Sequence, residues 1–77
     1  MTLNNGEINA TYIVEKLELP LHMEKRLEAL GMISGTKVEV LNNKSGGTLI
    51  IKVRGTRFAI GKGISSNIEV RRAWYGS

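Results

Sequence analysis

At residues 26–35 the chain reads Arg-Leu-Glu-Ala-Leu-Gly-Met-Ile-Ser-Gly, and this stretch predicts where a helix ends and a strand begins. Leu27 and Leu30 are three residues apart and share one helical face, and Gly31 follows where a chain leaving a helix favours a left-handed residue. Met32 stands where an apolar side chain can fold back on the last helical turn, and the Ser-Gly pair at 34–35 is typical of a tight turn. The stretch therefore predicts a corner that directs a helix into a small sheet.

Outside this corner, alternating apolar residues and glycine-rich breaks predict short strands. We expect strands at 7–14, 36–41, 48–54, 57–60 and 67–71, with a helix from Pro20 to Leu30. Five short strands separated by glycine turns fit a small closed barrel, because closure removes exposed sheet edges. The sequence thus predicts a mainly β, SH3-like barrel with one α-helix inserted after the first strand. Residues 61–63 leave room for a short helical turn before the last strand.

The predicted core combines the inward positions of these strands with one face of the helix. Its members are Ile8, Met23, Leu27, Leu30, Val38, Val40, Leu49, Ile51, Val53, Phe58, Ile60, Ile64 and Val70.

The length of 77 residues predicts a single domain over 1–77, with its core at about 7–71 and flexible tails at 1–5 and 73–77. The absence of cysteine suits a reducing compartment. Apolar runs are far shorter than the ~20 residues that span a bilayer, and the N-terminal residues are uncharged, unlike a signal peptide. We therefore expect a cytoplasmic protein.

Charge is distributed unevenly along the chain. Residues 1–39 hold four Lys and Arg against six Glu, whereas residues 40–77 hold seven Lys and Arg against one Glu. Lys52 and Arg54 point to the same side of their predicted strand, so a basic sheet face is expected. Such a face either simply solvates the barrel or meets an acidic protein, a nucleic acid or an anionic membrane.

The order of motifs resembles the ferrous iron transport protein A family, FeoA. The resemblance rests on Arg-Leu-x-x-Leu-Gly-Met-x-x-Gly-x-x-Val from Arg26, on Gly-Gly-x-Leu-x-Ile-x-Val-x-Gly from Gly46, and on Ile-x-Val from Ile68. It implies an SH3-like accessory protein that binds and modulates FeoB, the GTPase-coupled membrane transporter for ferrous iron. Related modules also end some metal-dependent repressors, so regulation of such a repressor is an alternative function. Recruitment to the inner face of the membrane would follow from the partnership with FeoB.

An adaptor of this kind would offer an apolar groove that takes an extended partner segment, either by adding a strand or by docking a proline-rich turn. We expect the contact at the corner, with basic residues attracting acidic partner groups. The candidate partner-binding residues are Leu30, Gly31, Met32, Ile33, Arg54, Arg57 and Lys62. Packing of Met32 and Ile33 inside the core is the competing interpretation.

Direct metal binding and catalysis find little support in the sequence. His22 is the only histidine and has no ligating residue three or four positions further on, while Glu24 and Glu28 alone hold a cation weakly. No bound metal or cofactor is therefore expected, and the link to Fe²⁺ is indirect. Without Cys or Asp, no nucleophile triad or acid–base pair can be assembled, which argues against an enzyme.

A nucleic-acid-binding barrel is the other alternative function. The few aromatic residues are not interleaved with the basic positions of one strand, so a stacking platform is missing. Trp74 and Tyr75, which follow two arginines, form an aromatic, basic tail that touches a partner or folds back over the barrel.

Overall fold

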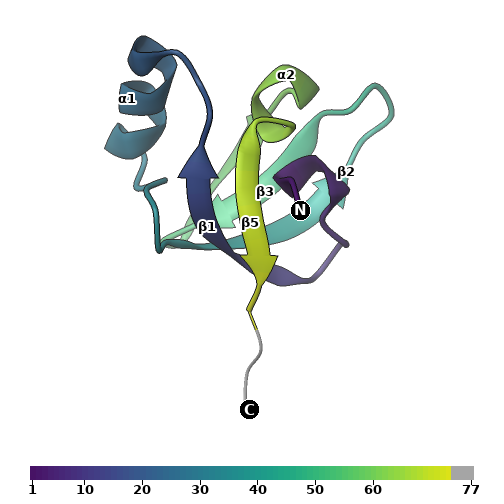
Figure 1. Ribbon diagram of the computed structural model, residues 1–77. Helices are drawn as coiled ribbons and strands as arrows, with labels where there is room; N and C mark the ends of the chain where they lie inside the picture. Colours follow the sequence, from purple (N-terminus) through teal and green to yellow (C-terminus); the bar gives the residue numbers. More distant parts are fainter. Residues whose placement is uncertain (74–77) are drawn as a thin grey trace.

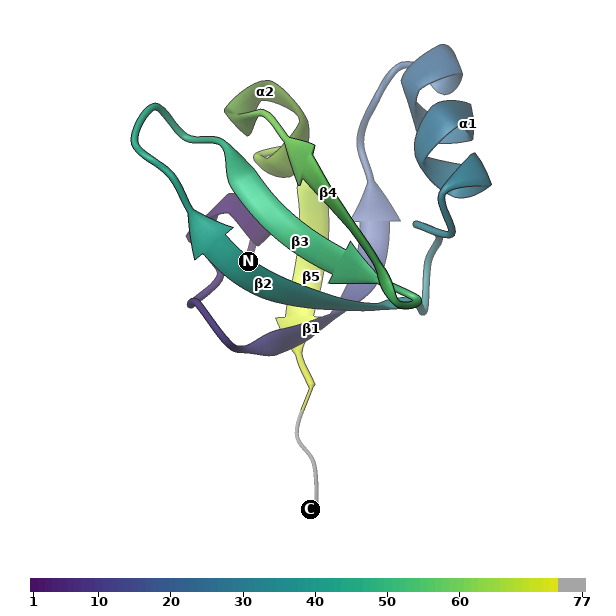
Figure 2. The same ribbon diagram turned by 180° about the vertical axis from the view of Figure 1, so that it is seen from behind.

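The described part of the chain, residues 1–73 of a computed structural model, folds around one antiparallel sheet with the strand order β4-β3-β2-β1-β5 (Figures 1 and 2). The strands are β1 (Thr11–Leu17), β2 (Lys37–Asn43), β3 (Leu49–Val53), β4 (Thr56–Ile60) and β5 (Ile68–Arg72). Helical segments are η1 (Leu3–Asn5), α1 (Leu21–Ala29) and α2 (Lys62–Ser65). The mainly β class with a helix after the first strand is confirmed, and α2 is the short helical turn before the last strand.

The sheet curls strongly, as the two opposite views make clear (Figures 1 and 2). The pairing register shifts between Val14 and Lys16 in β1 and between Val40 and Asn42 in β2, and such irregularities increase the local twist. The barrel does not close through hydrogen bonds as expected, because β4 and β5 are the two ends of the sheet and do not pair. The chain passes from β4 through α2 and enters β5 beside β1, so these two strands stand at opposite ends of the strand order.

Alternate residues of all five strands supply the core. The fully or almost fully buried strand residues are Tyr12, Val14, Val38, Val40, Leu49, Ile51, Val53, Ile60, Ile68 and Val70. Leu27 from α1 and Met32 from the corner join them. Met23, Phe58 and Ile64 are only partly buried.

Two residues of the predicted core lie at the surface. Ile8 is 51% exposed because Asn9, with φ of 70°, turns the chain before β1 begins, so the apolar alternation does not mark a strand there. Leu30 is 47% exposed because it caps the end of α1 instead of lying inside the helix.

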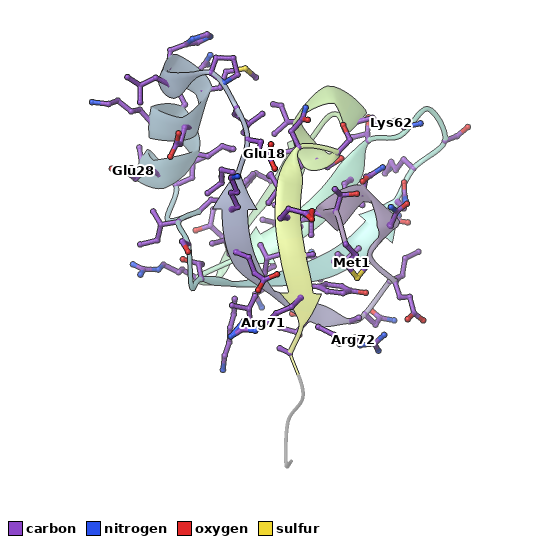
Figure 3. All side chains as sticks on the ribbon, viewed as in Figure 1. Met1, Glu18, Glu28, Lys62, Arg71 and Arg72 are labelled. Atoms are coloured by element: carbon purple, nitrogen blue, oxygen red, sulfur yellow. The ribbon has the colours of Figure 1, made fainter. Side chains whose placement is uncertain are left out.

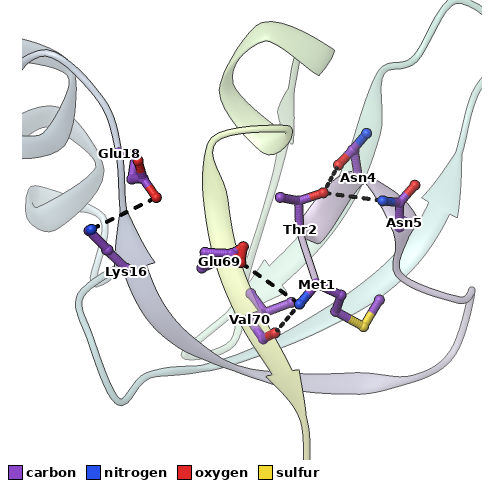
Figure 4. A network of polar contacts seen from close by, with 8 residues as sticks. All are labelled: Met1, Thr2, Asn4, Asn5, Lys16, Glu18, Glu69 and Val70. Atoms are coloured by element: carbon purple, nitrogen blue, oxygen red, sulfur yellow. Dashed lines mark hydrogen bonds and ion pairs between the residues drawn. The ribbon is translucent and has the colours of Figure 1, made fainter.

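The N-terminal residues belong to the core region. Leu3 is fully buried, so the core extends beyond the expected range of 7–71. The main-chain N–H of Val70 donates to Met1 O at 2.8 Å, and the Met1 amine lies near Glu69, which fastens the first residues along the outer edge of β5 (Figure 4). Of the tail expected at 73–77, residues 74–77 lie outside the described residues, Trp74 and Tyr75 included.

The helix ends as the sequence predicts. Gly31 has φ of +91°, its N–H donates to Glu28 O, and the N–H of Met32 donates to Leu27 O, both at 2.9 Å. This pair of bonds is the Schellman arrangement, in which the residue after the glycine packs on the last helical turn. Met32 and Leu27 are accordingly both buried in the core.

A tight turn completes the corner. Thr36 N–H donates to Ile33 O at 3.0 Å, and Gly35 takes φ of +91°, the value that a type II turn requires at that position. Gly35 N–H also donates to Val14 O at 2.7 Å, and Ser34 Oγ donates to Glu15 O at 3.1 Å. These bonds fasten the corner to β1, so it is a rigid surface feature.

Candidate functional site

An apolar groove separates α1 from β4 on the open side of the barrel. It has a volume of about 290 Å³, and its walls come from α1, β4 and α2. Figure 2 shows β4 in front with α1 beside it. The lining residues are Met23, Arg26, Leu27, Leu30, Phe58, Ala59, Ile60 and Ile64. The single charge among them is that of Arg26.

The corner forms a second hollow. Ile33, which is 41% exposed, lines it together with the turn residues 34–36, Lys37 and Arg54. The Arg54 side chain reaches across to the corner, since a Cβ built on Gly31 would lie 3.0 Å from Arg54 Cδ. The fold therefore brings Arg54 against the helix end, although 23 positions separate it from Gly31 in the sequence.

Basic side chains lie on the outer face of the sheet beside Arg54. Lys52 and Arg57 are directly opposite each other on β3 and β4, and Glu39 is opposite Lys52 on β2. Within residues 1–73, none of the ion pairs of the structure involves Lys52, Arg54 or Arg57. We call these three residues the basic face.

The predicted partner-binding residues divide into three groups. Leu30, Gly31, Ile33 and Arg54 meet at the corner, and Arg57 lies along β4 from them. Met32 is fully buried and offers no surface to a partner, so its placement at the contact is corrected: it supports the corner from beneath.

Lys62 does not join the corner. It begins α2 and packs on the loop between β2 and β3, where a Cβ on Gly47 would lie 3.0 Å from Lys62 Cβ. Figure 3 shows it beside that loop, on the other side of the molecule from α1.

Sequence reasoning missed the lining of the groove apart from Leu30. The sequence predicts Phe58, Ile60 and Ile64 as core residues; Ile60 is buried in the core, whereas Phe58 and Ile64 are half-buried, and their place in the groove wall follows only from the end of the sheet at β4. The charged residue Arg57 within an otherwise apolar strand is the sequence feature that indicates an edge strand.

Carboxylates and the histidine do not gather at any metal site. His22 is exposed on α1, Glu28 is exposed near the end of that helix, and no three His, Cys, Asp or Glu within residues 1–73 are grouped to hold a metal ion. No helix in the described range is long and apolar enough to cross a membrane.

Comparison with known proteins identifies the family. The model of the FeoA domain matches residues 1–72. The chain belongs to the FeoA domain family. A Methanocaldococcus jannaschii protein, provisionally named Fe(2+) transport protein A, is 36% identical over 64 residues, which cover 83% of this chain and 77% of that protein.

Solved FeoA structures share the fold. The crystal structure of an iron uptake regulatory protein (FeoA) superposes with a TM-score of 0.83 at 29% identity, covering 95% of this chain and 96% of the other. The FeoA of Stenotrophomonas maltophilia, solved with zinc and described as a prokaryotic SH3 domain protein, gives a TM-score of 0.78 at 26% identity over 92% and 89% of the two chains. The SH3-like fold and the place in the ferrous iron transport protein A family are thereby confirmed.

Proposed function

We propose that this FeoA-family chain is an accessory protein of ferrous iron transport, which binds a FeoB-type membrane transporter and modulates it from the cytoplasm. The observation that carries the proposal is the match of the FeoA domain over residues 1–72. The protein would be held at the inner face of the membrane by its partner, because the chain itself contributes no membrane-spanning helix within the described residues.

The proposed contact is the corner together with the basic charges near it. Leu30 and Ile33 are exposed apolar side chains at the corner, and the absence of a side chain on Gly31 leaves room for the Arg54 side chain. Arg57 on β4 adds positive charge that would attract acidic partner residues, whereas Lys62 lies away from the corner and is left out of the proposed contact. Such charges speed association more than they tighten binding.

The proposed action is binding without catalysis, with iron carried by the transporter. The support is chemical: the chain holds no Cys or Asp, and its one histidine is exposed on α1 and belongs to no group of three ligating residues within the described part of the chain. Nucleic acid is disfavoured as the partner, since among the described aromatic residues Tyr12 is fully buried and Phe58 is half-buried, which leaves the basic face without a stacking platform.

Uptake of ferrous iron tests the proposal. Cells that express the FeoB-type transporter of the same organism would receive the wild-type chain, the variant Ile33→Asp, or the matched control Ile8→Asp. Both isoleucines are about equally exposed, but only Ile33 lies at the corner. We expect Ile33→Asp to lower uptake and co-purification with the transporter at least about tenfold, the effect of losing a central apolar contact. Unchanged uptake with both variants refutes the proposed contact, and uptake independent of the chain refutes the function.

A further inference from the structure

The outer edge of β4 carries main-chain groups that face away from the sheet. Val53 and Thr56 are opposite each other and flank a two-residue turn, so they form the first hydrogen-bonded pair of the β3–β4 hairpin. Hydrogen bonding alternates along an antiparallel pair, which directs the N–H and C=O of Phe58 and Ile60 toward β3. The N–H and C=O groups of Arg57 and Ala59 therefore point outward, and among the described residues no strand pairs with them.

The two ends of the sheet differ in this respect. The edge of β5 is covered at Glu69 and Val70, because the N–H of Val70 donates to Met1 O and Thr2 forms a bridge with Glu69. The edge of β4 has no such cover and faces α1 across the groove (Figure 2). An uncovered edge is a template for a further strand.

The groove supplies pockets for alternate side chains of that strand. Phe58 and Ile60 point to the groove side of β4, and Leu30 with Leu27 faces them from α1. The groove has a volume of about 290 Å³ and is lined by apolar residues apart from Arg26, so it can take apolar side chains of such a strand.

The charges around the groove favour an acidic partner segment. Arg57 stands on the opposite face of β4 from the groove, Arg26 lines the groove, and no carboxylate does. A second copy of this chain pairing edge to edge about a two-fold axis near Arg57 would bring two Arg57 residues close together, and like charges in neighbouring strands destabilise the pair. An acidic segment of another protein has the complementary charge.

We propose that an extended, acidic segment of a partner protein adds to the sheet as a sixth strand along the outer edge of β4. Its alternate apolar side chains enter the groove beside Leu30, and its intervening carboxylates meet Arg57. The identification of the partner as the transporter rests on the proposed function. The binding site itself can be tested without that partner.

Amide hydrogen exchange in the full chain tests the site directly. The probe is the peptide acetyl-Glu-Val-Glu-Leu-Glu-Val-Glu-amide, added to the isotope-labelled protein. When nine-tenths of the protein is bound, exchange at the Arg57 and Ala59 amides should slow by up to about tenfold, because only the free fraction exchanges. The amides of Phe58 and Ile60, already bonded to β3, should change much less. Absence of saturable binding up to about 1 mM, or protection confined to another surface, overturns the inference.

Modified peptides separate strand addition from plain groove binding. Two modified peptides are compared: one is N-methylated at every glutamate, the other at every apolar residue. Each lacks one of the two alternating sets of main-chain N–H groups, and only the set that faces β4 forms hydrogen bonds in the proposed strand. One methylated peptide should bind at least tenfold more weakly than the other. Equal binding of the two refutes a hydrogen-bonded strand. A peptide with lysine in place of each glutamate should also bind at least tenfold more weakly, and equal affinity refutes the role of charge.

Protein variants locate the groove contact with a matched control. Leu30→Glu should weaken binding of the acidic peptide at least tenfold, whereas Leu21→Glu should leave it unchanged, since Leu21 is 67% exposed on α1 and does not line the groove. Equal effects of the two variants contradict the inference. The site and the proposed function can fail separately. If the peptide binds at β4 but iron uptake does not depend on the chain, the binding site stands and the transporter is excluded as its partner. If uptake depends on the chain but the peptide does not bind at β4, the transporter stands as the partner and the proposed site is excluded.

Discussion

Replacing Arg54 by asparagine should make the protein more stable. Arg54 and Gly55 form the two-residue turn between β3 and β4 and have φ of 52° and 82°. Hairpin turns with two positive φ angles favour Asn-Gly, because a residue with a larger side chain pays about 1–2 kcal/mol in the left-handed region and asparagine pays less. Subtracting a few tenths for the lost contact of the Arg54 stem with Gly31, we expect Arg54→Asn to gain about 0.5–1 kcal/mol.

Thermal unfolding followed by circular dichroism measures this gain. For a domain of this size 1 kcal/mol corresponds to about 4–8 °C, so the midpoint should rise by about 2–8 °C. Arg54→Lys keeps the charge and the backbone strain and serves as the control, with a midpoint close to that of the wild type. A midpoint of Arg54→Asn at or below the wild-type value would refute the reasoning. A strained arginine at the corner also fits a role in binding, since strain tends to persist at functional sites, and the same variant should associate more slowly with an acidic partner.

Three further substitutions test the interior and the corner by urea denaturation. Tyr12→Phe removes the hydroxyl that accepts a 2.7 Å hydrogen bond from the Glu7 N–H, and should cost about 1–3 kcal/mol; a loss below 0.5 kcal/mol would mean that water replaces the hydroxyl. Met32→Ala should cost about 2–5 kcal/mol, because it leaves a cavity under the corner, and a loss under 1 kcal/mol would contradict its full burial. Gly31→Ala should lower the free energy of unfolding by about 1–2 kcal/mol because residue 31 has a positive φ. The new methyl group should cost additional stability through its contact with Arg54, and this additional loss should disappear when Arg54 is also replaced by alanine. Additive effects of the two substitutions would refute the contact.

The elements that follow from local rules could be predicted closely from the sequence. Pro20 and Gly31 mark the two ends of the helix, because each restricts or permits backbone angles regardless of the rest of the fold. Val38, Val40, Ile51 and Val53 are buried as their alternation indicates, since a strand with one covered face has only one way to orient its side chains.

Positions that depend on distant parts of the chain could not be predicted in this way. Leu3 is isolated in a polar stretch, and only the arrangement of η1 over the sheet shows why it is buried. Met32 and Ile33 are consecutive apolar residues, but Met32 is buried and Ile33 is exposed, because the direction of the chain after Gly31 places them differently. The groove likewise arises from the end of the sheet at β4, a property of strand order that no local pattern in the sequence contains.

The attachment of the first residues to β5 has a practical consequence for engineering. Since Met1 and Val70 are joined by main-chain hydrogen bonds, the first residue lies beside the last strand, and a short linker can connect the two. A circularly permuted version, opened at Gly46 in a loop where a Cβ would meet nothing within 4 Å, should keep every strand pairing. An affinity tag fused before Met1 would remove the charged amine that lies near Glu69, whereas a tag inserted at Gly46 would leave that amine in place.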